Sequence, residues 1–454
     1  MNSRRTFIKQ SLAVSAGFMG LSQFVNEPVF AEAVKMRPVI DQWLELPEGF
    51  VAKIISSSGE KMADGFLLPG KPDGMAAFKV GRNVVLVRNH ENSPTAPKYG
   101  PYGEDMALLN KIKKENVYDY GFGKTPGLGG TTTLIFDEDK QIVKEQFLSL
   151  TGTTRNCAGG PTPWNSWITC EEDTTVRSAS AETNHGYNFE IPAAGKKLVT
   201  PVPLKAMGRF NHEAVCVDPS TGIVYQTEDA HDGLIYRFIP NKPGKLQDGG
   251  MLQALAIRGQ KSFDTRNWNA ESMKIGEAFE VEWITLSNVD PDTDDLRLRG
   301  NAQGAALFAR GEGMWFGNKE VYFACTNGGQ KKMGQVFKYV PGANEGKSDE
   351  KNAPGKLLLF AESPSIDILK NCDNLTVSPW GDVILVEDAK GACLRGITPD
   401  GRIYTIGKNI GSDSEMAGVC FSPSGKTLFV NIQHDGLTFA ITGPWNQLRD
   451  KHKA

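Results

Sequence analysis

The sequence has no apolar run beyond Val25 that is long enough to cross a bilayer, so we expect a soluble mature protein without stable membrane insertion. Its formal net charge is only -3, which gives no electrostatic reason to expect nucleic acid or an anionic membrane as a partner. The seven cysteines contain no CxxC pair and are odd in number, which argues against a disulfide scaffold. The sequence still allows one or two disulfides, and it does not decide whether Cys157, Cys372 and Cys393 pair.

The N-terminus carries the features of an export signal. Arg4-Arg5 precedes a mildly apolar run from Ser11 to Val25, and Phe30–Ala33 is an A-x-A-like cleavage site. This order predicts a twin-arginine signal peptide over residues 1–33, with the twin-arginine export machinery as a partner and a periplasmic or secreted location. The alternative is an amphipathic N-terminal helix that carries Arg-Arg by coincidence. Residues 34–454 are then expected to form a single domain and a monomer.

Long amphipathic helical patterns are scarce, and short β-rich runs bounded by Gly, Pro, Asn and Asp take their place. Four stretches can be superimposed as strand–turn–strand hairpins, and two further stretches have the same shape. They begin at Asn156, Asn211, Asn371 and Glu415, with the further two beginning at Ala309 and Val80. Repeated hairpins of this kind are typical of β-propellers. We therefore predict an all-β, six-bladed β-propeller.

The predicted hairpins share polar residues at one end. First strands open with Glu213, Glu312, Asp373 or Glu415, and second strands finish in pairs such as Glu171-Glu172 and Glu387-Asp388. Since the start of one strand lies beside the end of the next, these acids should gather at one rim, several of them around the propeller axis. Carboxylates so close together repel one another unless cations neutralise them. The set predicts a central metal site, although any single residue is as readily interpreted as a solvent-facing turn former.

The chain resembles a known family, the PhoX alkaline phosphatases. The resemblance rests on motifs in family order over nearly the whole mature chain. They are RNHE (88–91), GGTTTL (129–134), NCAGGPTPWNSWITCEE (156–172), GRFNHEA (208–214), RGEG (310–313), CTNGG (325–329), DNLTVSPWGD (373–382) and FSPSGKTLFVNIQH (421–434). It implies a six-bladed propeller with a central cluster of Fe³⁺ and Ca²⁺ ions that hydrolyses phosphate monoesters in the periplasm, with a small phosphate ester as substrate.

The resemblance also implies roles for particular residues. Arg310 would bind the substrate phosphate, which a guanidinium can contact through two hydrogen bonds. The implied metal ligands are Cys170, Glu171, Glu172, Glu213, Glu312, Asp373, Glu387 and Asp388, with one member of each acidic pair as the ligand. Cys170 is otherwise a small buried hydrophobe. His90 and His212 fit equally as ligands or as structural hydrogen-bonding groups. The lysine expected as a second phosphate contact cannot be placed by motif.

Two other functions fit a propeller with an acidic centre. A lactonase or esterase of the paraoxonase kind needs one catalytic calcium but neither Cys170 nor Arg310. A non-enzymatic, calcium-stabilised binding module would lose stability without metal and turn over no ester. The phosphatase interpretation is favoured because a thiolate ligand and a site arginine are superfluous in the other two.

Overall fold

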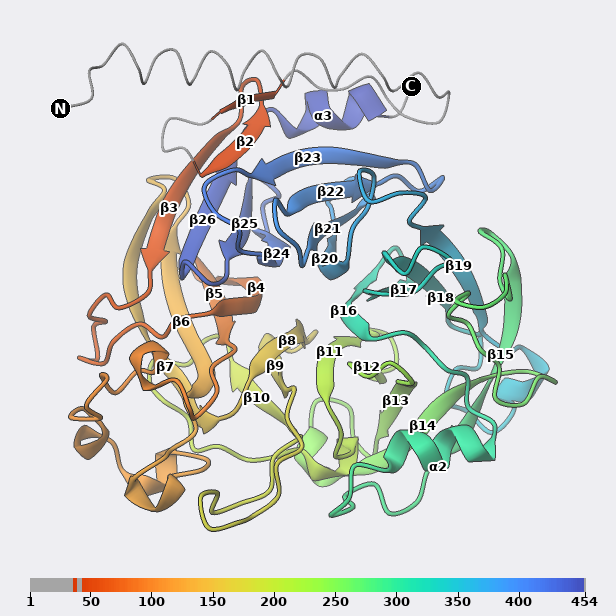
Figure 1. Cartoon of the computed structure of the whole chain (residues 1–454), viewed down its shortest axis with the longest axis horizontal. Helices are drawn as coiled ribbons and strands as arrows, with labels where there is room; N and C mark the ends of the chain where they lie inside the picture. Colours follow the sequence, from red (N-terminus) through yellow and green to blue (C-terminus); the bar gives the residue numbers. More distant parts are fainter. Residues whose placement is uncertain (1–35, 39–42, 453–454) are drawn as a thin grey trace.

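A computed structural model describes residues 36–38 and 43–452, of which 36–38 are described by their backbone only. Five β-sheets stand around a common centre, so the prediction of an all-β, propeller-like fold is confirmed (Figure 1). The predicted signal peptide (1–33) lies outside the described residues. Within the described ranges, no helix is both long and apolar enough to span a membrane.

Three of the sheets are each built from one continuous stretch of the chain. The first contains β4 (Pro72–Val80), β5 (Asn83–His90), β6 (Gly129–Asp137) and β7 (Ile142–Thr153), and the second contains β8 (Asn156–Pro161), β9 (Ser166–Glu171) and β10 (Asn188–Pro192). The nine-stranded sheet runs β11-β12-β13-β14-β15-β19-β18-β17-β16. Its strands are β11 (His212–Val217), β12 (Val224–Glu228), β13 (Ile235–Pro240), β14 (Gly250–Ile257), β15 (Ala278–Thr285), β16 (Gly311–Gly317), β17 (Glu320–Cys325), β18 (Gln335–Val340) and β19 (Lys356–Glu362).

The remaining two sheets join the two ends of the chain. In the first, β20 (Cys372–Val377), β21 (Val383–Glu387), β22 (Cys393–Ile397) and β23 (Ile403–Asn409) are extended by β2 (Leu44–Pro47) and β1 (Met36–Pro38). In the second, β24 (Met416–Phe421), β25 (Thr427–Ile432) and β26 (Leu437–Thr442) are completed by β3 (Val51–Ser57), which pairs with β26. A strand from the start of the chain therefore closes the last sheet.

Helical segments are short in the described part of the chain. The α-helices are α2 (Leu296–Gln303) and α3 (Trp445–His452). Single 3₁₀ turns occur at Pro97–Tyr99, Leu109–Lys111, Lys114–Asn116, Gly121–Gly123, Lys205–Met207, Leu246–Asp248 and Glu350–Asn352.

Six strands form a closed ring at the centre. In order around the ring they are β4, β8, β11, β16, β20 and β24, and each contacts the next, with β24 returning to β4. Five of them are first strands of hairpins predicted from the sequence, and the sixth predicted stretch, from Val80, covers only the end of β4 together with β5. The hairpin between β16 and β17 turns through Asn318 and Lys319, both at positive φ (55° and 65°), as a tight two-residue turn requires.

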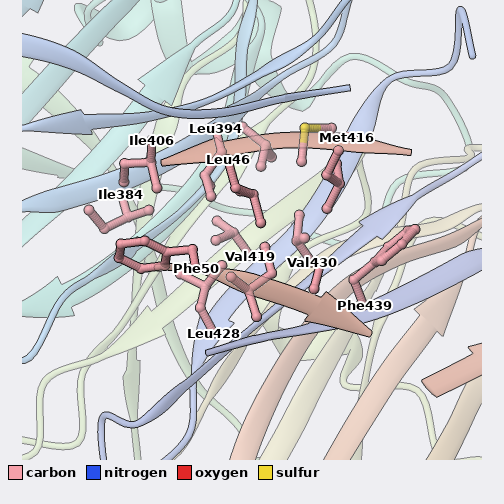
Figure 2. Packing of buried hydrophobic residues seen from close by; sticks show 14 of the residues in the cluster. Leu46, Phe50, Ile384, Leu394, Ile406, Met416, Val419, Leu428, Val430 and Phe439 are labelled. Atoms are coloured by element: carbon pink, nitrogen blue, oxygen red, sulfur yellow. The ribbon is translucent and has the colours of Figure 1, made fainter. Parts of the chain in front are cut away.

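Buried apolar side chains fill the space between neighbouring sheets. Figure 2 shows the cluster between the last two sheets, where Leu46 and Ile384 meet Val430 and Phe439. All seven cysteines lie in the described part of the chain, and each is a buried free thiol, which answers the open question of disulfides.

Glycines allow the inner strands to approach one another closely. A methyl group on Gly313 of β16 would lie 2.6 Å from the Cα of Asn374 in β20. Because the obstacle is backbone, relief requires the two strands to separate. The acids that precede these residues, Glu312 and Asp373, would then move apart.

We therefore expect Gly313→Ala to lower the free energy of unfolding by about 2 kcal/mol, a typical cost of overpacking. Denaturant unfolding with metal analysis of the same sample measures both consequences. A variant as stable as the wild type would show that β16 and β20 can separate without cost.

Candidate metal centre

Each inner strand contains one extra residue near its start, so the pairing register shifts there. In five strands the first residue inside this bulge is an acid or a thiol. The five residues are Asp73, Cys157, Glu213, Glu312 and Asp373; in β24 the position is Gly418. A bulge re-aims a side chain out of the regular alternation of a strand. Because the bulges occur at matching places around a ring, they collect chemically similar groups at its centre.

The ligand atoms of these side chains lie close together in two groups. Cys157, Glu172 and Glu213 form one group, and Glu213, Glu312 and Asp373 form the other, with the ligand atoms of each group within 4.8 Å of one another. Glu213 belongs to both groups, so they form one continuous centre. Glu172 follows the last residue of β9 and is partly buried, whereas the other four are buried.

Burial disfavours the ionised forms of the side chains at this centre. Desolvation raises the pKa values of Asp73, Glu213, Glu312 and Asp373 well above the ordinary range, and neighbouring carboxylates raise them further. Desolvation likewise raises the pKa of the Cys157 thiol. Without cations these groups would be held largely protonated. The set has the composition of a metal site, because thiolate with carboxylate suits iron and carboxylate oxygens alone suit Ca²⁺.

Two arginines lie at the mouth of the centre in equivalent positions. Arg155 and Arg310 each directly precede an inner strand, and each has a left-handed backbone, with φ of 49° and 50°. Arg155 binds Glu91 (Nε to Oε1, 3.0 Å) and Glu172, and Arg310 binds Asp229 (Nε to Oδ1, 2.8 Å). Their side chains are 38% and 31% exposed, so one edge of each guanidinium remains open to a ligand.

Lys71, at φ 46°, precedes β4 in the same way, and this makes it a structural candidate for the lysine that no motif could place. Carboxylates still outnumber basic groups around the axis. They are Asp73, Glu91, Glu172, Glu213, Asp229, Glu312, Asp373, Asp388 and Glu415. Two further neutral oxygens, Thr326 Oγ1 and Gln433 Oε1, are buried there without a hydrogen-bond partner. The surplus of charge and the unpaired oxygens both fit bound cations.

The structure separates the predicted acidic pairs. Glu171 accepts hydrogen bonds from the backbone N–H groups of Thr154 (3.0 Å) and Gly186 (3.0 Å) and contacts His185 Nδ1 (2.7 Å). It therefore anchors loops, and Glu172 is the member of the pair that belongs to a ligand group.

Glu387 is occupied in the same way. It accepts hydrogen bonds from the N–H groups of Lys370 and Cys393 (3.0 Å each) and from Arg395 Nε (2.8 Å). Its neighbour Asp388 is exposed and lies near Asp373 and Glu415, outside the two ligand groups.

The structure places the predicted thiol ligand, Cys170, away from both ligand groups. Cys170 is fully buried in a hydrophobic cluster with Ile168 and Val215 and belongs to neither ligand group. Side chains alternate along β9, so Cys170 shares a face with Ile168 and packs into the core. Cys157, in the bulge of β8, is the thiol at the centre.

Both histidines left open by the sequence are structural. His90 bridges Gly70 O (Nδ1, 2.9 Å) and Thr132 Oγ1 (Nε2, 2.8 Å). His212 donates from Nε2 to Gly208 O (3.0 Å), and burial lowers its pKa to about 3. Sequence reasoning placed Glu91 at the rim but missed Asp73, Cys157 and Arg155 as site residues, all of which lie in or beside the inner strands.

The chain was compared with known families, curated proteins and solved structures. The model of the family described as "Alkaline phosphatase PhoX" matches residues 32–436. No curated protein sequence matches the chain.

Solved structures similar in fold share little sequence with the chain. They include a gluconolactonase of Xanthomonas campestris (12% identity, TM-score 0.42, covering 91% of this chain and 98% of that one). A putative gluconolactonase (11%, 0.41, 88% and 93%) and a Bacteroides thetaiotaomicron protein of unknown function (12%, 0.44, 87% and 76%) are similar at the same level.

Proposed function

The chain belongs to the alkaline phosphatase PhoX family, and from this membership we propose that it hydrolyses phosphate monoesters at a metal centre on the propeller axis. We count the two halves of the nine-stranded sheet as separate blades, β11 to β14 and β16 to β19, which makes six blades around the ring. We further propose that the protein acts in the periplasm or outside the cell after twin-arginine export. The observation that carries the proposal is the matching bulge in the inner strands, with an acid or thiol in five of six.

The two ligand groups differ in chemistry, which suggests how the metals divide between them. Cys157 with Glu172 and Glu213 would hold Fe³⁺, since a thiolate favours a softer metal than calcium. Glu213, Glu312 and Asp373 offer only carboxylate oxygens and would hold Ca²⁺. When bound, such ions supply positive charge for the phosphate oxygens and lower the pKa of water.

The arginines would bind and orient the substrate. A phosphate monoester is a dianion, and a guanidinium can contact it through two parallel hydrogen bonds. Arg310 is already fixed by Asp229, and Arg155 by Glu91 and Glu172, so neither must be ordered when substrate arrives.

The test is elemental analysis of protein purified from its export compartment, with p-nitrophenyl phosphate turnover on the same sample before and after chelation. We expect iron and calcium together, and turnover that chelation abolishes. Arg310→Ala and Arg155→Ala should each lower kcat/KM by about 100-fold, the lower end of the range for losing one preorganised electrostatic contact to the reacting group. Arg258→Ala is the matched control, because Arg258 pairs with the exposed Glu280 on β15. Calcium alone without phosphatase activity would refute the proposal and favour a calcium-dependent lactonase or binding module.

A further inference from the structure

Three chain segments converge beside Arg310 at the mouth of the ring. The backbone N–H of Arg310 donates to Ala230 O (2.9 Å), and Arg310 O accepts from the N–H of Thr326 (3.0 Å). The residues that follow β12 and β17 therefore flank this arginine on both sides. The third segment, 262–268, runs parallel to the stretch that leads into Arg310, with Asp264 opposite Leu307.

Side chains from the three segments are bonded into one wall. Asn327 Nδ2 lies 3.1 Å from His231 Nδ1, and Trp268 Nε1 donates to Asn327 O (2.7 Å). Arg266 Nη1 donates to His231 O (3.0 Å), and Arg266 O accepts from the N–H of Gly329 (2.9 Å). The wall is thus fixed in place next to the proposed phosphate-binding arginine.

The outer part of the wall carries uncompensated positive charge. Arg266 and Lys332 both lie over the ring of Trp268, at 4.4 Å and 5.1 Å from its centroid. Arg266 is neutralised by two hydrogen bonds to Asp264 (2.7 Å each). Lys332 has no carboxylate within ion-pair distance among the residues that the structure describes, and it is exposed. Its stacking on Trp268 limits where the ammonium can lie.

We propose that this wall is a subsite for the alcohol side of the ester, and that it favours phosphomonoesters whose alcohol carries a second anionic group. The inference rests on the proposed phosphatase function. With the phosphoryl group on Arg310, the alcohol portion extends along the wall toward Lys332. A carboxylate or second phosphate there meets the ammonium group of Lys332, which none of the described carboxylates neutralises. A neutral alcohol gains nothing from Lys332.

The experiment compares 3-phosphoglycerate with glycerol 3-phosphate, which differ by a carboxylate in place of a CH₂OH group. We expect wild-type protein to prefer 3-phosphoglycerate roughly fivefold in kcat/KM, the upper range for a partly exposed ion pair. The preference should fall as salt is added, because such a pair is screened. Lys332→Ala should bring the ratio to about one, and Lys332→Glu should reverse it.

Lys351→Ala, which removes another exposed lysine, is the control and should keep the wild-type ratio. A wild-type ratio near one, or a preference that survives both Lys332 variants, would overturn the subsite but leave the phosphatase function standing. Failure to hydrolyse these two esters and p-nitrophenyl phosphate would overturn both.

Discussion

Metal-free protein is expected to lose stability as pH rises, whereas metal-loaded protein should not. The cause is the ring of buried acids, whose pKa values are raised by desolvation and by one another. Glu415, near Asp388 at the edge of this ring, has a pKa raised to about 11 for the same reasons. A cation would remove the repulsion and allow the ionised forms.

The direction of the change in stability with pH depends on how tightly each carboxyl group binds a proton in the folded and the unfolded state. A carboxyl group whose folded pKa lies above its unfolded value binds a proton more tightly when folded. Its stabilising contribution is complete below the unfolded pKa, near 4, and is lost as pH rises toward the folded value. Every raised carboxyl pKa around the axis acts in this direction. Their sum makes the effect large, since each tenfold gain in proton affinity on folding corresponds to about 1.4 kcal/mol.

The measurement is the Tm of chelated and metal-loaded protein between pH 5 and pH 9. We expect the chelated Tm to fall by about 10 °C over this range and the loaded Tm to stay nearly constant. Glu213→Gln should flatten the profile of the chelated protein, because it removes a buried charge at the place where both ligand groups meet. Glu171→Gln is the contrasting variant and should destabilise at every pH, because this carboxylate is held by hydrogen bonds. If the Tm of the chelated protein did not change with pH, the acids around the axis would not be destabilised by burial and mutual repulsion as proposed.

The fold was predictable because its signal is local. The strands are short apolar runs, the turns contain Gly, Pro and Asn, and the same hairpin recurs along the chain. Such a pattern identifies each hairpin without knowledge of its neighbours. The pairing of β3 with β26 was not predictable in this way, since its two strands lie at opposite ends of the described chain.

The sequence predicted that acidic residues gather at one rim of the propeller, but not which residues lie at the centre. The sequence stretches beginning at Asn156 and Asn211 were superimposed on their asparagines, but the bulges place Asn156 opposite Glu171 and His212 opposite Glu228. The correct superposition is shifted by one residue and puts Cys157 level with Glu213. Both strands carry the bulge at the matching place, so the offset comes from the asparagines: Asn156 is the first residue of β8, whereas Asn211 precedes β11.

The choice within each acidic pair depended on distant loops. Glu171 is occupied because the chain returns at His185 and Gly186 with donors aimed at it. Burial of His185 opposes a charged imidazole, but Glu171 and Asp119 outweigh it and raise the pKa of His185 to about 10. The sequence close to residues 171 and 172 does not indicate that His185 and Gly186 are the partners of Glu171.

Cys157 lies at the centre in place of the predicted Cys170. The second large effect is therefore an expected difference in iron content and turnover between Cys157→Ala and Cys170→Ala. The Cys157 thiol lies with Glu172 and Glu213, and burial keeps its pKa high, so a thiolate there requires a cation. We expect Cys157→Ala to lose iron and to lower kcat/KM at least 100-fold, since even the loss of a residue that only supports a ligand costs about 10–100-fold. Cys170→Ala removes a sulfur from the apolar cluster around Ile168 and Val215. It should cost about 1 kcal/mol of stability and leave iron content and turnover near the wild-type values.

Iron content, kcat/KM and denaturant unfolding of the two variants decide between the two thiols. The matched design matters because both side chains are buried and both lose the same atom, so a general cost of truncation cancels in the comparison. If Cys170→Ala lost the iron and Cys157→Ala kept it, the bulge in β8 would not present its residue to the metal. Equal loss from both variants would show that iron binding depends on packing between β8 and β9 as a whole. The expected asymmetry ties the chemistry to one structural cause, the single extra residue that turns Cys157 out of its strand and toward the axis.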